Sequence, residues 1–267
     1  MFMDNTYWLH QTTERPLFEA VIWNQPQRRN VAGKLAIIGG NGHGFNIVSE
    51  VFALANQAGI GVSRVLMPDS LSHTIGKIWP DCEFAPSTKS GGFATTALTE
   101  WQNLASWADG TLICGDLGRN SETAILLDRF LETNSEFVAL FGDALDLAIS
   151  TPLSLINRGN LLIGPSLSQF QKLLSSIRYP TAIKSSLSLD QLADLLHSLT
   201  LNYKLSIVYV HEGIVFIADA GQVSSTPTTY DTIGRTITAS TVWRLQQPAK
   251  PFEAMTSAIY KFGLQAA

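Results

Sequence analysis

Apolar residues recur in two different rhythms between Thr111 and Ile149, and together they predict a strand, a helix and a second strand. Thr111–Cys114 and Phe137–Phe141 are short apolar runs, as is typical of buried strands. Between them Ser121 can cap a helix with apolar residues on one face, namely Ala124, Leu127, Phe130 and Leu131. A strand, a crossover helix and a strand form a right-handed βαβ unit, so this stretch predicts part of a parallel sheet.

The same pattern occurs once more upstream. Lys34–Ile38 and Val62–Met67 are the expected strands, and Asn46–Gln57 is the expected helix, which ends before Gly59 and Gly61.

Shorter patterns fill the rest of the chain. The expected helices are Ala94–Trp107, Ser168–Ser176, Ser188–Thr200, Thr236–Gln246 and Phe252–Phe262, with a short one within Pro152–Asn160. The further expected strands are Leu161–Ile163, Ala182-Ile183 and a hairpin of Leu205–Val210 with Gly213–Ala218 around His211-Glu212. These alternations predict one α/β domain over residues 1–267, a three-layer sandwich with a mostly parallel central sheet and a late hairpin. Residues 1–32 are expected to form a short helix and an irregular lead-in.

Composition excludes several classes of protein. The 267 residues are 45% hydrophobic and 15% charged, with a net charge of −4, which argues against a broad nucleic-acid surface. Apolar runs fall short of a membrane span, and the first residues lack the pattern of a signal peptide, so we expect a cytoplasmic protein. Cys82 and Cys114 are expected to be free thiols in a reducing compartment. Without a cluster of Cys and His at ligand spacing, no structural metal site is expected.

Glycine-rich turns follow the expected strands, and ligands of parallel sheets bind at the strands' carboxyl ends. Gly39–Gly44 either wraps a phosphate or substrate, through donors on Asn41 and His43, or is a plain turn rich in glycine. Gly115–Gly118 either positions a cofactor or is only a tight turn. Asp143 at a strand end either binds a ligand or caps the next turn, because an idle carboxylate there is costly.

Taken together, these segments resemble the ribokinase-like superfamily, and within it the ADP- or ATP-dependent NAD(P)H-hydrate dehydratases. KLAIIGGNGHGFNIVSEVFALANQAGIGVSRVLMP is similar to that family's strand, Gly-Gly turn, helix and next strand. ADGTLICGDLGRN resembles its Gly-rich turn, VALFGDALDLA its acidic strand end, and PFEAMTSAIYKFGLQAA its closing helix. The resemblance is collinear from about Arg28 to Ala267, which carries more weight than any single glycine motif.

Three departures from the family pattern bear on catalysis. The family's G-[TA]-G-D signature corresponds to Thr232-Ile233-Gly234-Arg235, so an arginine stands at the position of the catalytic aspartate. The T-P-H-P-G-E exit corresponds to 164–169, where Gln169 replaces the glutamate. The lysine-glycine turn corresponds to His211-Glu212-Gly213, without the lysine.

The resemblance therefore implies a nucleotide-binding homologue of a carbon-oxygen lyase with reduced or lost catalysis. Two alternatives stay open: an active dehydratase or small-molecule kinase with a relocated acid/base, for which Asp143 and Asp231 are candidates, and a structural oligomer subunit without nucleotide binding. The implied cofactor is ATP or ADP with possible Mg²⁺, an NAD(P)H-type ligand is conceivable, and a homo-oligomer is expected. The cofactor-binding candidates are Gly115, Gly118, His211, Gly213, Gly234 and Arg235. The substrate-binding candidates are Gly40, Asn41, His43, Asp143 and Gly164.

Overall fold

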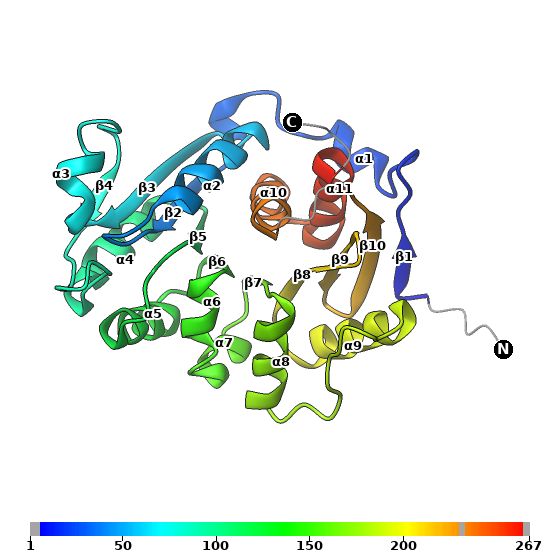
Figure 1. Ribbon diagram of the computed structural model, residues 1–267. Coiled ribbons are helices and arrows are strands. Elements are labelled where there is room, and N and C mark those ends of the chain that lie inside the picture. Colours follow the sequence, from blue (N-terminus) through cyan, green and yellow to red (C-terminus); the bar gives the residue numbers. More distant parts are fainter. Residues whose placement is uncertain (1–5, 230–232, 264–267) are drawn as a thin grey trace.

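The alternating strands and helices build one ten-stranded sheet with helices on both faces. The structure, a computed structural model, describes residues 6–229 and 233–263 and is drawn in Figure 1. The strands are β1 (Trp8–His10), β2 (Lys34–Gly39), β3 (Val62–Pro68), β4 (Glu83–Ala85), β5 (Gly110–Cys114), β6 (Phe137–Phe141), β7 (Leu161–Gly164), β8 (Ser206–His211), β9 (Ile214–Asp219) and β10 (Gln222–Pro227).

The helices connect most neighbouring strands. They are α1 (Glu19–Trp23), α2 (Asn46–Gln57), α3 (Ser72–Ile75), α4 (Leu98–Trp107), α5 (Ser121–Thr133), α6 (Asp143–Ala148), α7 (Pro152–Asn157), α8 (Leu167–Ser176), α9 (Leu189–Asn202), α10 (Ile233–Gln246) and α11 (Pro251–Gly263). Three single 3₁₀ turns are described as well, at Arg29–Val31, Asp69–Leu71 and Thr95–Ala97.

The strand order is β1-β10-β9-β8-β7-β6-β5-β2-β3-β4. From β4 to β8 all neighbours pair in parallel, whereas β9 pairs antiparallel with both β8 and β10. The expected mostly parallel sheet with a late hairpin is therefore confirmed. Because the strands from β2 to β8 share one direction, their carboxyl ends meet at one edge of the sheet.

Each face of the sheet has its own apolar core. Trp101 of α4 lies edge-on between Phe93 and Phe130 on the face that α4, α5, α8 and α9 cover. The opposite, concave face holds α2, α10 and α11, which the sheet surrounds in Figure 1. Burial on both faces explains why strands such as Phe137–Phe141 are apolar at every position rather than at alternate ones.

Helix α10 is enclosed on all sides. Its eight consecutive residues from Thr236 to Trp243 are all buried. It packs against α2, α11 and strands β5 to β8. Small residues such as Ala239 and Ser240 allow the neighbouring helices to approach closely, and Thr238 satisfies its hydroxyl by donating to the Gly234 carbonyl at 2.6 Å.

Several boundaries differ from the sequence-based expectations. Ala182-Ile183 is not a strand; it lies in an irregular segment, where the Ile183 carbonyl accepts a hydrogen bond from Gln171. The cap of α5 is Asn120 rather than Ser121, because the Asn120 side chain accepts from the Glu122 backbone N–H. The predicted helix Ala94–Trp107 begins with a 3₁₀ turn, and its α-helical part is α4.

The amino-terminal segment is more ordered than the expected lead-in. Trp8–His10 pairs with β10 as an edge strand, and neither strand was predicted. The Gln11 side chain is buried and donates to the Thr226 hydroxyl and to the Thr256 carbonyl. The segment is thus fastened to its own sheet.

Cys82 and Cys114 are buried and form no disulfide. In the described ranges, no helix combines the length and the apolar character that crossing a membrane requires.

Gly39 is the point where a side chain is least tolerated at the end of β2. A Cβ there would lie 2.0 Å from the Cys114 carbonyl oxygen and 2.8 Å from Val48 Cγ2. We expect Gly39→Ala to decrease the free energy of unfolding, because a backbone carbonyl cannot move aside. The decrease should be near the upper limit of the ~1–3 kcal/mol that is typical of overpacking.

The matched control is Gly234→Ala, whose Cβ would meet only Phe141 ring atoms at 3.5 Å or more. Alanine also favours the helix by about 0.5–1 kcal/mol, so this variant should be as stable as the wild type or more stable. Urea unfolding of both variants measures the difference. Equal stability of the two variants would contradict the close packing at Gly39.

Candidate functional site

The candidate residues gather at the carboxyl edge of the sheet. Each of β2, β5, β6, β7 and β8 ends there, and the amino-terminal end of α10 lies against the same edge. The edge carries Gly40, Asn41 and His43 after β2, Gly115 and Gly118 after β5, Asp143 after β6, Gly164 at the end of β7, His211 and Gly213 at the end of β8, and Gly234 and Arg235 on α10. Asp231 lies outside the described residues. The shared edge agrees with the sequence analysis, whereas the roles of these residues stay predictions.

The Asn41 side chain braces the first turn. Its Nδ2 donates to the Asp116 carbonyl at 2.7 Å, and its Oδ1 accepts from the His43 backbone N–H at 2.7 Å. Asn41 is buried, whereas the His43 side chain is exposed. His43 is therefore the better placed of the two to meet a ligand.

The exits of β5 and β6 touch one another. Gly115 and Gly142 both have positive φ, at 73° and 63°, which favours glycine. A Cβ on Gly142 would lie 3.9 Å from the Gly115 nitrogen. These turns bring Asp116 and Asp143 into one neighbourhood.

Asp143 carries the clearest electrostatic signal at this edge. Burial raises the pKa of its carboxyl, the charges of Asp116 and Asp146 raise it further, and Arg119 opposes them. Asp143 makes no side-chain hydrogen bond to the residues that the structure describes. The group therefore holds its proton to a higher pH than an ordinary aspartate.

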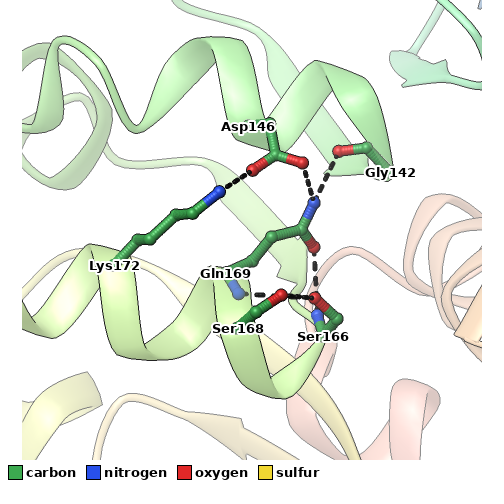
Figure 2. A network of polar contacts seen from close by, with 6 residues as sticks. All are labelled: Gly142, Asp146, Ser166, Ser168, Gln169 and Lys172. Carbon is green, nitrogen blue, oxygen red and sulfur yellow. Dashed lines mark hydrogen bonds and ion pairs between the residues drawn. The ribbon is translucent and has the colours of Figure 1, made fainter.

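Asp146, one helical turn further on, is tied into a polar network with Gln169 (Figure 2). Gln169 Nε2 donates to Asp146 Oδ2 at 2.8 Å and to the Gly142 carbonyl at 2.9 Å. Its Oε1 accepts from the Ser166 backbone N–H at 3.0 Å, which closes a capping box at the start of α8. Lys172 Nζ binds the other oxygen of Asp146 at 3.0 Å.

Although burial raises the pKa of Asp146, the hydrogen bonds from Gln169 and Lys172 outweigh it, and the net shift is downward. The pKa values of the two neighbouring aspartates are thus shifted in opposite directions, upward for Asp143 and downward for Asp146, so Asp146 is held ionised. The sequence analysis treated Gln169 only as a missing glutamate and did not find this network. A signal was present, because Ser166 and Gln169 have the S-x-x-Q spacing of a capping box.

Gly164 is needed for close packing. A Cβ there would lie 2.9 Å from Ile237 Cδ1 and 3.0 Å from Ile233 Cγ1, both on α10. This glycine brings the first turn of α10 onto the end of β7. Its expected substrate contact stays a prediction.

Arg235 is turned toward the far end of another helix. Its Nε donates to the carbonyl of Phe262 in the last turn of α11 at 3.2 Å. The start of α10 is the positive end of that helix dipole, whereas the last carbonyls of α11 are unpaired within their helix and carry partial negative charge. The guanidinium thus lies at the negative end of the α11 dipole rather than at the positive end of the α10 dipole.

His211 is buried, with 8% of its surface exposed, and is not an ordinary turn residue. Its ring stacks on Tyr209 at 6.2 Å between centroids, and its Nε2 has no hydrogen-bond partner among the described residues. The turn itself consists of Glu212 and Gly213, whose φ values of 48° and 74° suit a tight hairpin.

Comparison with known proteins bears on the fold. No protein-family model and no curated protein matches the sequence. A ribokinase-like superfamily protein from Enterococcus faecalis superimposes with a TM-score of 0.71 at 15% identity, covering 99% of this chain and 88% of that one. An ADP/ATP-dependent NAD(P)H-hydrate dehydratase from Bacillus subtilis, crystallised with ATP and Mg²⁺, gives 0.60 at 14% identity, covering 93% and 87%.

A protein from Streptococcus mutans gives a TM-score of 0.61 at 14% identity, covering 91% of this chain and 86% of that one. The chain therefore has the ribokinase-like fold, as its motifs predict. At these identities the similarity establishes the architecture and not the activity.

The Gln169 network predicts that a glutamate at this position is destabilising. In Gln169→Glu a carboxylate would face Asp146 Oδ2 and the Gly142 carbonyl, so two hydrogen bonds would become repulsive contacts. We expect a loss of about 1–3 kcal/mol in the free energy of unfolding at pH 7. The new carboxyl has a raised pKa in the folded state, so the penalty applies above its unfolded pKa of about 4.3 and fades as the pH falls toward that value.

Lys172→Met is the matched control. It removes the ion-pair partner of Asp146. Because the Lys172 side chain is 62% exposed, the loss in the free energy of unfolding should be less than about 1 kcal/mol. Melting temperatures of the three proteins between pH 4 and 8 provide the test. A pH-independent difference between wild type and Gln169→Glu would refute the electrostatic reason.

Proposed function

We propose that this protein is a nucleotide-binding relative of the NAD(P)H-hydrate dehydratases in which dehydration has been lost or reduced. The nucleotide, ATP or ADP, would bind at the carboxyl edge of the sheet. Support comes from the ribokinase-like fold and from the Bacillus subtilis dehydratase of similar fold, which was crystallised with ATP and Mg²⁺. Ligands of open α/β sheets bind at this edge in general.

The observation that carries the proposal is the environment of Arg235. In the family pattern an aspartate stands there as acid/base, whereas in this chain the Arg235 Nε is bonded to the Phe262 carbonyl. Arginine keeps its proton at physiological pH and cannot take that role. Loss of a general acid/base typically costs ~10²–10⁴ in rate.

Groups suited to a phosphate or ribose remain at this edge. Gly115 and Gly118 have positive φ and present backbone N–H groups in a tight turn, and Arg119 beside them is exposed. Asp116 and Asp143 offer carboxylate oxygens, the ligands that Mg²⁺ accompanying a nucleotide prefers, and the cation would supply charge neutralisation. The remaining candidates are Gly234, in the first turn of α10, and His211 and Gly213, at the end of β8 and in the turn after it.

A thermal-shift series tests the proposal. ATP or ADP should raise the melting temperature, since a ligand at a hundredfold excess over its Kd stabilises the folded state by about 2.7 kcal/mol. Turnover of hydrated NADH or NADPH with either nucleotide should be undetectable. Robust turnover by the wild type would overturn the proposal, and no shift with any nucleotide would favour a purely structural subunit.

Arg235→Asp extends this test. It should restore little turnover, because the glutamate and lysine positions also differ. It should lower the free energy of unfolding by about 1–3 kcal/mol, because a carbonyl of α11 loses a charged donor and gains an acid nearby. Arg235→Lys, which keeps the charge, is the matched control and should lose less.

A second candidate function rests on Asp143. An active enzyme with a relocated acid/base needs a carboxyl that can hold a proton near neutral pH, and the pKa of Asp143 is shifted in that direction. Its position after β6 is also where substrates of parallel sheets bind. The reaction class would remain dehydration or phosphoryl transfer to a small molecule.

Asp143→Asn separates this role from a structural one. An acid whose pKa is raised by folding destabilises the folded state when ionised. The variant should therefore melt higher than the wild type at pH 7, and the difference should fade toward an unfolded pKa of about 3.9. If Asp143 serves chemistry or binding, nucleotide affinity or turnover falls at the same time. Asp81→Asn, at an exposed site, is the control. A melting temperature of Asp143→Asn below that of the wild type at pH 7 would contradict the conclusion that the ionised Asp143 carboxylate destabilises the folded state.

A further inference from the structure

The edge of the sheet opposite the candidate nucleotide site is hollowed. A cavity of about 830 Å³ lies where several strands begin, with Lys34, Val62 and Phe137 in its wall. A second cavity of about 670 Å³ adjoins it, and Asn160 and Arg244 line both. The first volume is within the ~300–1,000 Å³ range of small-molecule sites.

Arg244 lies between the two cavities. It belongs to the last turn of α10, and its guanidinium stacks over the Phe137 ring at 4.4 Å. Its Nη1 donates to the Ser206 hydroxyl at 3.0 Å, and that hydroxyl donates to Asp219 at 2.5 Å. Its other guanidinium N–H groups bond to none of the described residues.

Arg158, at the same edge, is an arginine with a structural role and serves as a comparison for Arg244. Its guanidinium donates to the backbone carbonyls of Leu131, Asn134, Glu136 and Asn160. All three guanidinium nitrogens of Arg158 thus donate to the protein, whereas Arg244 donates from one nitrogen. The dipole of α10 and the charge of Asp219 account for a cation at Arg244, but not for its remaining donors.

The residues around Arg244 indicate which chemical class of ligand the first cavity would bind. Phe137, Leu245 and Val62 give the first cavity apolar walls, and the charges of Arg29 and Lys34 add to that of Arg244. Asp109 and Glu136 in the same wall oppose a multiply charged anion. Guanidinium groups bind carboxylates through parallel, charge-assisted hydrogen bonds.

We propose that this amino-edge cavity is a second binding site, which takes a small organic monocarboxylate with an apolar body. The carboxylate pairs with the free N–H groups of Arg244, and the apolar body lies against Phe137 and Leu245. The site is separate from the carboxyl edge, so it does not depend on the nucleotide proposal.

Benzoate and its uncharged analogue benzamide are the probes, measured by isothermal titration at pH 7 with full-length protein. Benzoate should bind and benzamide should bind at least about tenfold more weakly, because the charge-assisted pair is lost. Arg244→Met keeps the packing on Phe137 and should weaken benzoate binding by a similar factor. Val62→Trp adds bulk to the wall of the first cavity at a position other than Arg244 and should also weaken benzoate binding, so the test does not depend on one variant's folding.

Lys204→Met is the control, because Lys204 lines only the second cavity, and it should leave benzoate binding unchanged. Saturating ATP should not displace benzoate. Equal affinity for benzamide, unchanged binding to Arg244→Met, or binding of inorganic phosphate in place of benzoate would each overturn the assigned site or ligand class.

Discussion

The complete enclosure of α10 is the constraint on which the rest of the structure depends. An α-helix with eight consecutive buried residues needs partners on every side, and here α2, α11 and the concave face of the sheet supply them. Such a helix cannot carry charged residues along its middle. Thr236 and Thr238 donate to carbonyls within the helix, whereas the buried hydroxyls of Ser240 and Thr241 have no hydrogen-bond partner among the described residues. The two ends of α10 are therefore fixed at opposite edges of the sheet. The amino-terminal end can pack against the end of β7 because Gly164 has no side chain there.

That constraint also shapes the candidate site. The resemblance to the dehydratases aligns Arg235 with the family's catalytic aspartate, Gln169 with its glutamate, and His211-Glu212-Gly213 with its lysine-glycine turn. In the structure, Arg235, Gln169 and His211 each make an internal contact. Arg235 reaches the end of α11, Gln169 holds Asp146 and the exit of β6, and His211 stacks on Tyr209. These three side chains are compatible with one another and with the fold. Under the proposed function, their internal contacts are the reason that Arg235→Asp alone is expected to restore little turnover.

The sequence predicts the elements whose burial follows from their own periodicity. Phe137–Phe141 and Asn46–Gln57 have the predicted bounds because apolar spacing is a local property. Strand β10 is missed because Ser224 and Thr226 are polar, and in the structure they bond to distant partners, Thr256 and Gln11. Strand β1 is missed with it because β10 is the strand with which it pairs. The carboxyl edge follows from glycine turns after strands. The Gln169–Asp146 network does not, because it joins residues 23 positions apart and no local pattern encodes their contact.

The two arginines at the ends of α10 obey the same helix electrostatics with opposite outcomes. Arg235, at the positive end, is unfavourable for that helix dipole, and its side chain reaches the negative end of α11. Arg244, at the negative end, is already stabilised by its own helix, so the protein need not use its remaining donors to hold it. The first therefore donates from its Nε to another helix. The second keeps N–H groups available beside the cavity at the amino edge of the sheet, opposite the candidate nucleotide site.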